Sequence, residues 1–335
     1  MSKINTWKVW LPMISLLIFF LIVEVIFRFI IVHKDTNKTI AGIVEFDSDL
    51  IWRLKPRSSG ILATNELGFR DSSYKHNSDY KILLLGDSVS WGDGVEMKQS
   101  YPFLLEEMLI RNYPGKTFEI INTGVPGYST FQQLIYLKKD GIKLKPNMII
   151  HQFCLNDVVQ RFSVLFEYGG DNVFLGIDTR NSIHGFHGWM ITHSRAYEMV
   201  IRYLINFQKN KQEYAVINLS KNELSSELEG AWKLVLNEIS EIAQIAKQEK
   251  IPYLFIVAPY RFQLTNPDNT NQPQIRLKRF AESKNLMFFD LLDPFYLNHQ
   301  IYGMSLFDDA SHFSINGHIL AATYLHDKII NIIKK

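Results

Sequence analysis

The chain has 335 residues, of which 47% are hydrophobic and 13% aromatic, enough for one large α/β domain with additions or for two small domains. The formal net charge is +2, and no basic stripe with interleaved aromatic residues is present, so nothing indicates a nucleic-acid partner. The single cysteine, Cys154, excludes an intramolecular disulfide. His184, His187 and His193 lie close together, but no cysteine or Glu-x-x-His pattern accompanies them, so no metal and no other cofactor is expected.

The first predicted element is an apolar helix near the amino terminus. Val9–Val32 is long enough to cross a hydrocarbon core of about 30 Å as a helix. Its charged residues Glu24 and Arg28 fall on one helix face, where they can pair. Two lysines precede the run, and neither a small-residue cleavage site nor a lipobox cysteine follows it. We therefore expect an uncleaved signal anchor over residues 1–33. The basic residues on its two sides are nearly even in number, so charge does not decide its orientation.

Residues 34–79 are rich in turn-forming residues and are expected to be a membrane-proximal connector. From residue 80 to the end, short apolar runs typical of buried strands alternate with amphipathic helical patterns. Strands are predicted over 81–85, 118–122, 147–153, 253–257 and 286–289, and helices over 100–113, 129–141, 223–249, 273–284 and 315–333. This alternation indicates an α/β fold with a flavodoxin-like, doubly wound parallel sheet.

An insertion over about 158–222 interrupts this alternation. It contains several aromatic residues separated by glycines, and it leaves the predicted sheet directly after Asn156-Asp157. Two interpretations fit: the insertion forms a wall or partial lid of the substrate site, or its aromatic residues only pack it onto the core.

The most informative motif is Gly86-Asp87-Ser88, which directly follows the apolar run 82–85. A serine just past the carboxyl end of a parallel strand lies where open α/β sheets bind their ligands. By itself the triplet is also ordinary turn chemistry. A serine nucleophile further requires a base, a group that orients the base, and donors for the oxyanion.

Asp309 and His312 supply a candidate orienting carboxylate and base near the carboxyl terminus. In a turn, an aspartate three residues before a histidine can fold back onto the imidazole, which fixes the tautomer and leaves the other nitrogen for Ser88. Taken alone, the pair is also compatible with a turn aspartate and a surface histidine.

Two further segments can supply oxyanion donors. Asn122–Gly127 follows the strand-like residues 118–121, and its glycines let backbone amides approach a ligand closely. Asn156-Asp157 follows the strand predicted at 147–153 and can present a side-chain amide at the same sheet edge. The alternatives are a tight turn at Pro126-Gly127 and a helix cap at Asn156-Asp157.

Together these four motifs resemble the blocks of the SGNH hydrolase family, the GDSL-type esterases and lipases, from about Lys81 to the end of the chain. The resemblance implies the SGNH three-layer fold. It also implies a catalytic triad of Ser88 as nucleophile, His312 as base and Asp309 as its orienting carboxylate.

For the oxyanion hole, the resemblance implies the backbone amides of Ser88 and Gly127 and the side chain of Asn156. One position departs from the family pattern, because Cys154 stands where the third block has glycine. A side chain at this position can narrow the site or tilt the loop that carries Asn156.

The expected activity is that of a membrane-anchored serine esterase or deacylase, which acts through an acyl-enzyme on a small-molecule, glycan or lipid ester, with acylated envelope glycans or lipids as candidates. The alternatives are an O-acyltransferase acting on envelope polysaccharide, in which a sugar hydroxyl replaces water, and a non-catalytic scaffold. Membrane-anchored relatives commonly place the catalytic domain outside, which implies an extracytoplasmic domain here. Neither the exact ester nor the oligomeric state follows from the sequence.

Overall fold

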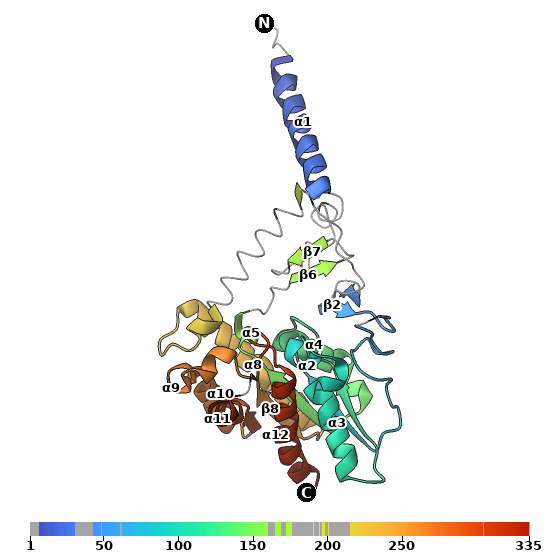
Figure 1. Cartoon of the computed structure of the whole chain (residues 1–335), viewed down its shortest axis with the longest axis vertical. Coiled ribbons are helices and arrows are strands. Elements are labelled where there is room, and N and C mark those ends of the chain that lie inside the picture. Colours follow the sequence, from blue (N-terminus) through green and yellow to red (C-terminus); the bar gives the residue numbers. More distant parts are fainter. Residues whose placement is uncertain are drawn as a thin grey trace.

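The computed structural model of the chain is shown in Figure 1. It describes residues 7–30, 43–47, 49–60, 62–159, 165–168, 172–175, 190, 194, 196–197, 200, 215–303 and 305–334. Most of the 158–222 insertion, including His184, His187 and His193, lies outside the described residues.

A five-stranded parallel sheet forms the centre of the fold, in the order β4-β3-β5-β8-β9. The strands are β3 (Tyr80–Leu85), β4 (Phe118–Asn122), β5 (Met148–Phe153), β8 (Tyr253–Val257) and β9 (Met287–Asp290). Strand β3, which comes first in the sequence of this sheet, lies between β4 and β5, and β8 and β9 follow beyond β5. This is the flavodoxin-like, doubly wound order that the sequence predicted.

Helices cover both faces of the sheet. Because strand-to-strand crossovers are right-handed, the reversal of direction at β3 places the helix after β3 on one face and those after β4, β5 and β8 on the other. On the first face, α3 (Tyr101–Asn112) packs against α12 (Ile315–Ile333), and on the second, α4 (Thr130–Lys139) packs against α8 (Ser226–Gln248). Helix α10 (Gln272–Ser283) leads into β9. These helices match the predicted ones to within a few residues at each end.

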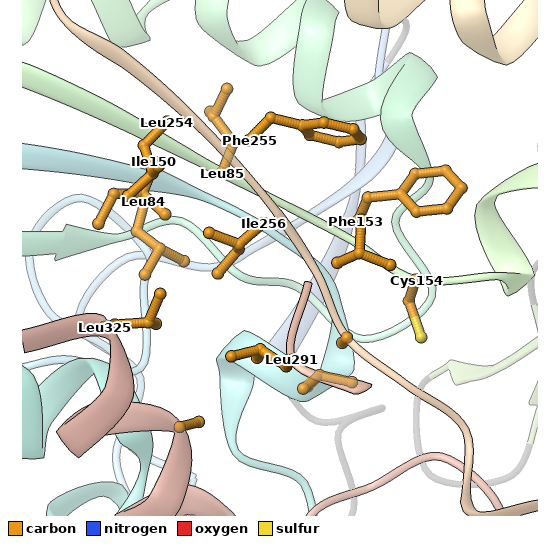
Figure 2. Close-up of a cluster of buried hydrophobic side chains, with 14 of the residues drawn as sticks. Leu84, Leu85, Ile150, Phe153, Cys154, Leu254, Phe255, Ile256, Leu291 and Leu325 are labelled. Atoms are coloured by element: carbon orange, nitrogen blue, oxygen red, sulfur yellow. The ribbon is translucent and has the colours of Figure 1, made fainter. Parts of the chain in front are cut away.

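The apolar runs that predicted strands form the buried centre of the molecule. Residues 82–85 of β3 have no exposed surface, and the central residues of β5 and β8 are equally buried. Figure 2 shows side chains of neighbouring strands, such as Leu84, Ile150 and Leu254, gathered in one cluster. Since these strands have helices on both faces, a continuous apolar sequence is what their environment requires.

Several elements were not predicted. Helix α11 (Leu292–Tyr302) has Pro294 in its first turn, where proline is tolerated, and only Leu292 and Phe295 of its residues are buried, so its amphipathic signal is weak. The remaining short elements are α2 (Ser88–Trp91), η3 (Met97–Gln99), η4 (Gly141–Leu144), α5 (Asn156–Val159), β6 (Leu165–Tyr168), β7 (Asn172–Leu175), η6 (Arg261–Leu264) and α9 (Pro267–Thr270).

The connector contains an antiparallel hairpin of β1 (Val44–Asp47) and β2 (Ile51–Leu54), which packs against residues that follow β3 and β4. The rings of Trp52 and Tyr128 lie 5.4 Å apart, and the Tyr128 hydroxyl donates to the Trp52 carbonyl at 2.7 Å. Further along the connector, the buried Arg70 guanidinium donates to the carbonyls of Trp91, Gly92 and Val95 at 2.8–3.1 Å. The connector is therefore joined to the segment that follows Ser88.

Helix α1 (Trp7–Ile30) projects away from the five-stranded sheet and its covering helices in Figure 1. Its segment Trp10–Arg28 has a mean hydropathy of 2.5 and no buried residue, which makes it long and apolar enough to cross a membrane. Arg28 Nε lies 2.9 Å from Glu24 Oε1, so the ion pair predicted on this helix face is formed.

Candidate active site

The turn that carries Ser88 is built at the carboxyl end of β3. Ser88 is the first residue of α2, and Asp87 caps this helix by accepting a hydrogen bond from Val89 N–H at 2.9 Å. Gly86 is required here, because a Cβ at this position would overlap the Ser90 side chain and lie 2.8 Å from Gln152 Oε1. The turn therefore holds Ser88 at the edge of the sheet, partly exposed, above fully buried neighbours.

Ser88, His312 and Asp309 form a continuous series of hydrogen bonds. His312 Nε2 lies 2.8 Å from Ser88 Oγ, and His312 Nδ1 lies 2.6 Å from Asp309 Oδ2. The other carboxylate oxygen of Asp309 accepts the backbone N–H groups of Ser311 and His312, both at 2.8 Å. These backbone contacts orient the carboxylate toward the ring, in the turn that the Asp-x-x-His spacing suggested.

The electrostatics of the pair favour a charged imidazole. Burial alone would lower the pKa of His312, but the Asp309 hydrogen bond and the charges of Asp93, Asp309 and Asp87 outweigh it and raise the pKa above its usual value. Partial burial would raise the pKa of Asp309, yet the His312 ring and the two backbone donors hold it well below its usual range. Asp309 therefore stays ionised at all ordinary pH values and supports a proton on His312.

The loop after β4 lies against the Ser88 turn. A Cβ on Gly124 would lie 2.7 Å from Trp91 N and 2.9 Å from Asp87 O, so only glycine allows this approach. Asn122 ties the two segments together, because its Nδ2 donates to the Ser90 carbonyl at 2.8 Å and its Oδ1 accepts Gly124 N–H at 3.1 Å. Gly127 has a φ of +79°, a left-handed conformation that favours glycine.

Asn156 lies at the carboxyl end of β5, as the first residue of α5. It is 8% exposed, and its Nδ2 donates to Asp87 Oδ2 at 3.3 Å, which places the amide beside the residue that precedes Ser88. Cys154 is 1% exposed, and Figure 2 draws its side chain among the buried hydrophobic residues. The cysteine at the usual glycine position thus packs in the core.

A buried layer of polar groups, which sequence reasoning missed, lies beneath the turn. Ser90 Oγ lies 2.6 Å from Tyr101 Oη and donates to Gln152 Oε1 at 2.7 Å, and the same Gln152 oxygen accepts Asp87 N–H at 3.3 Å. Tyr101 N–H in turn donates to Nδ1 of the buried His318 at 3.1 Å. These residues carry no motif of their own. The only available signal was a polar pair, His151 and Gln152, within a strand that is otherwise apolar.

Asp157 belongs to the same buried region. Burial and the nearby charge of Asp87 raise its pKa well above the usual value, and its Oδ2 accepts the Thr130 hydroxyl at 3.0 Å. Burial also raises the pKa of Asp87. Asp157 therefore joins the start of α4 to the end of β5 through a buried hydrogen bond.

The sequence over residues 82–325, from β3 into α12, matches the model of the family of GDSL-like lipases and acylhydrolases. The chain belongs to this family. It is therefore a hydrolase that acts on ester bonds. Among curated protein sequences, no match was found.

Solved structures resemble this GDSL hydrolase at low identity. A lipolytic protein of the G-D-S-L family from Desulfitobacterium hafniense DCB-2 is 13% identical with a TM-score of 0.45, over 74% of this chain and 99% of that one. A catalytic mutant of Axe2, an acetylxylan esterase from Geobacillus stearothermophilus, is 15% identical with a TM-score of 0.48, over 75% and 94% of the two chains. A two-domain esterase active on acetylated mannans is 16% identical with a TM-score of 0.45, over 75% of this chain. The match spans about half of that esterase, 49%.

Proposed function

We propose that this GDSL hydrolase is a membrane-anchored serine esterase in which Ser88 is the nucleophile, His312 the general base and Asp309 the carboxylate that orients it. The hydrogen-bonded series Asp309–His312–Ser88 is the observation that carries the proposal. Neutral His312 takes the Ser88 proton at Nε2 as Oγ attacks the ester carbonyl. The imidazolium then returns this proton to the departing alcohol, and water cleaves the acyl-enzyme by the same steps.

The donors proposed for the oxyanion are the backbone N–H groups of Ser88 and Gly127 and the side chain of Asn156. Support comes from Gly124, which brings the loop after β4 against the Ser88 turn, and from the Asn156–Asp87 contact. The left-handed Gly127 has no side chain to obstruct its own N–H.

The anchor is proposed to be helix α1, within an organisation of anchor (1–33), connector (34–79) and hydrolase domain (80–335) with its insertion. The length and hydropathy of α1 support this. We place the hydrolase domain on the extracytoplasmic side, where acylated envelope glycans and lipids are the available esters.

The test compares the full-length wild type in detergent with Ser88→Ala, using a fluorophosphonate serine probe and p-nitrophenyl acetate. We expect labelling to vanish and turnover to fall on the order of 10⁴-fold or more, because the nucleophile is lost. Ser283→Ala, at the exposed end of α10, removes a hydroxyl far from the site and should behave as wild type. Labelling that persists in Ser88→Ala would contradict the assignment of the nucleophile.

A further inference from the structure

A second carboxylate lies close to His312, on the segment that follows α2. This segment, Gly92 to Gly94, has two glycines in left-handed conformations, with φ of +79° and +85°, on either side of Asp93. Asp93 N–H donates to the Ser88 carbonyl at 3.1 Å. The backbone thus returns to the start of α2 and carries the Asp93 side chain to the Ser88 side of the imidazole.

The carboxylates of Asp93 and Asp309 lie near different nitrogens of the His312 ring. Asp93 Oδ2 lies 3.7 Å from His312 Nε2, the nitrogen that also contacts Ser88 Oγ, whereas Asp309 binds Nδ1. A separation of 3.7 Å is an ion-pair distance and not a hydrogen bond, so Asp93 leaves Nε2 available to Ser88. A positive charge that forms on the ring therefore lies between two negative groups.

Asp93 is held in this position by its surroundings. Arg70 donates to the carbonyls of Gly92 and Val95, on both sides of the Asp93–Gly94 pair. A Cβ on Gly94 would lie 3.0 Å from Asp308 Oδ2, so the segment packs closely against the loop that carries Asp309 and His312. The Asp93 carboxylate is 52% exposed, but its backbone is fixed by these contacts.

We propose that Asp93 is a positioning residue whose carboxylate stabilises protonated His312 from the Nε2 side. This inference rests on the proposed function, because it concerns the base of that reaction. During acylation the Ser88 proton moves to Nε2 while the bond from Oγ to the acyl carbon forms, and the proton leaves with the alcohol when the ester C–O bond breaks. The Asp93 carboxylate lowers the energy of the imidazolium at both stages.

Other groups face the same ring and limit the expected effect. Asp309 and the buried Asp87 also favour the proton on His312, and both remain when Asp93 is replaced. From α12, the buried His318 faces the site as a neutral group, because burial lowers its pKa to about 3. Since activity requires neutral His312, the rate rises with pH through the His312 pKa. Removing the Asp93 charge moves this rise to lower pH.

The experiment measures the rate of fluorophosphonate labelling against pH for the full-length protein in detergent. For Asp93→Asn we expect the midpoint of the pH profile to fall by about 0.5–1 unit. Asp308→Asn changes the net charge equally on the neighbouring loop and should keep the wild-type midpoint. About 1 M NaCl should lower the wild-type midpoint toward that of Asp93→Asn, because salt screens exposed charges. A midpoint that is equal in wild type and Asp93→Asn would overturn the proposal.

A direct titration separates this proposal from the proposed function. Histidine-selective NMR, with the His312 signal assigned through His312→Gln, gives the protonation midpoint of the ring without any turnover. A lower protonation midpoint of His312 in Asp93→Asn, measured by NMR, supports the electrostatic role of Asp93 whether or not the wild type is labelled. A wild type that fails to label would instead overturn the esterase mechanism. Asp93→Glu restores the charge and should restore the wild-type midpoint. If Asp93→Asn does not fold, the salt dependence of the wild type and the Asp93→Glu titration remain as tests.

Discussion

The polar groups at the carboxyl edge of the sheet form two layers that differ in burial. The outer layer, Ser88, Asp309 and His312, is partly or largely exposed and comes from two turns that are distant in sequence. The inner layer, Ser90, Tyr101 and Gln152, is buried and spans α2, α3 and β5. Two histidines show the consequence. The pKa of His312 is raised by its carboxylate neighbours, whereas burial lowers that of His318, behind Tyr101, to about 3.

This difference in burial indicates that the outer layer exchanges protons and that the inner layer holds the Ser88 turn in place. A group that exchanges protons must reach both the solvent and the substrate, so its neighbours set its charge. A group that holds the turn in place performs best when buried and fully hydrogen-bonded, since the cost of losing a partner is then highest. Substitutions in the outer layer should therefore affect turnover with little effect on stability, and those in the inner layer should affect stability more than turnover.

The largest effect that separates the layers is expected for Asp309→Asn. The amide keeps the shape of the carboxylate but neither holds the required tautomer nor stabilises the imidazolium, so kcat for p-nitrophenyl acetate should fall about 10⁴-fold. The thermal midpoint should stay within about a degree of the wild type, because Asp309 is largely exposed. A loss of turnover accompanied by an equally large loss of stability would remove the distinction between the layers.

Asn156→Ala sharpens the comparison, because Asn156 lies between the two layers. It is buried against Asp87 and is also the proposed side-chain donor to the oxyanion. We expect kcat to fall about 10²–10³-fold with little change in KM, as for the loss of a donor that acts in the transition state. A rise in KM at constant kcat, measured by steady-state kinetics, would instead assign Asn156 to substrate binding.

The smallest effect on turnover is expected for Tyr101→Phe in the inner layer. The change removes the hydroxyl that contacts Ser90 at 2.6 Å and should cost about 1–2 kcal/mol of stability, a few degrees in the thermal midpoint. Turnover should fall by about tenfold or less, because the Ser88 turn keeps its other contacts. Tyr302→Phe, at a 64% exposed tyrosine of α11, is the matched control. A fall in turnover of more than about tenfold, with the thermal midpoint unchanged, would place Tyr101 in the outer layer.

The sequence predicted the sheet well because its strands are continuous apolar runs buried on both faces, such as residues 82–85 of β3. It also located Ser88, Asp309 and His312, since a strand end and an Asp-x-x-His turn are local patterns. The hydrogen bonds that join them are present in the structure, and their catalytic roles stay predictions.

The inner layer could not be predicted, for a physical reason. Ser90 and Gln152 are 62 residues apart, and each looks ordinary in its own segment. Their contact exists only because β3 and β5 are neighbours in the sheet. The same holds for Arg70, whose buried role depends on how the connector folds over the catalytic domain. Helix α11 was missed because its apolar residues show little helical periodicity.

The three hydrogen bonds from Arg70 set a lower limit on the length of any shortened form of this protein that still folds. The family match begins at residue 82, but a chain cut there would leave the carbonyls of Trp91, Gly92 and Val95 without their guanidinium donor. It would also uncover Trp91, Val125 and Tyr128, which the β1–β2 hairpin buries. A soluble version should therefore start before Ile43, so that the smallest intact enzyme is longer than the region by which its family is recognised.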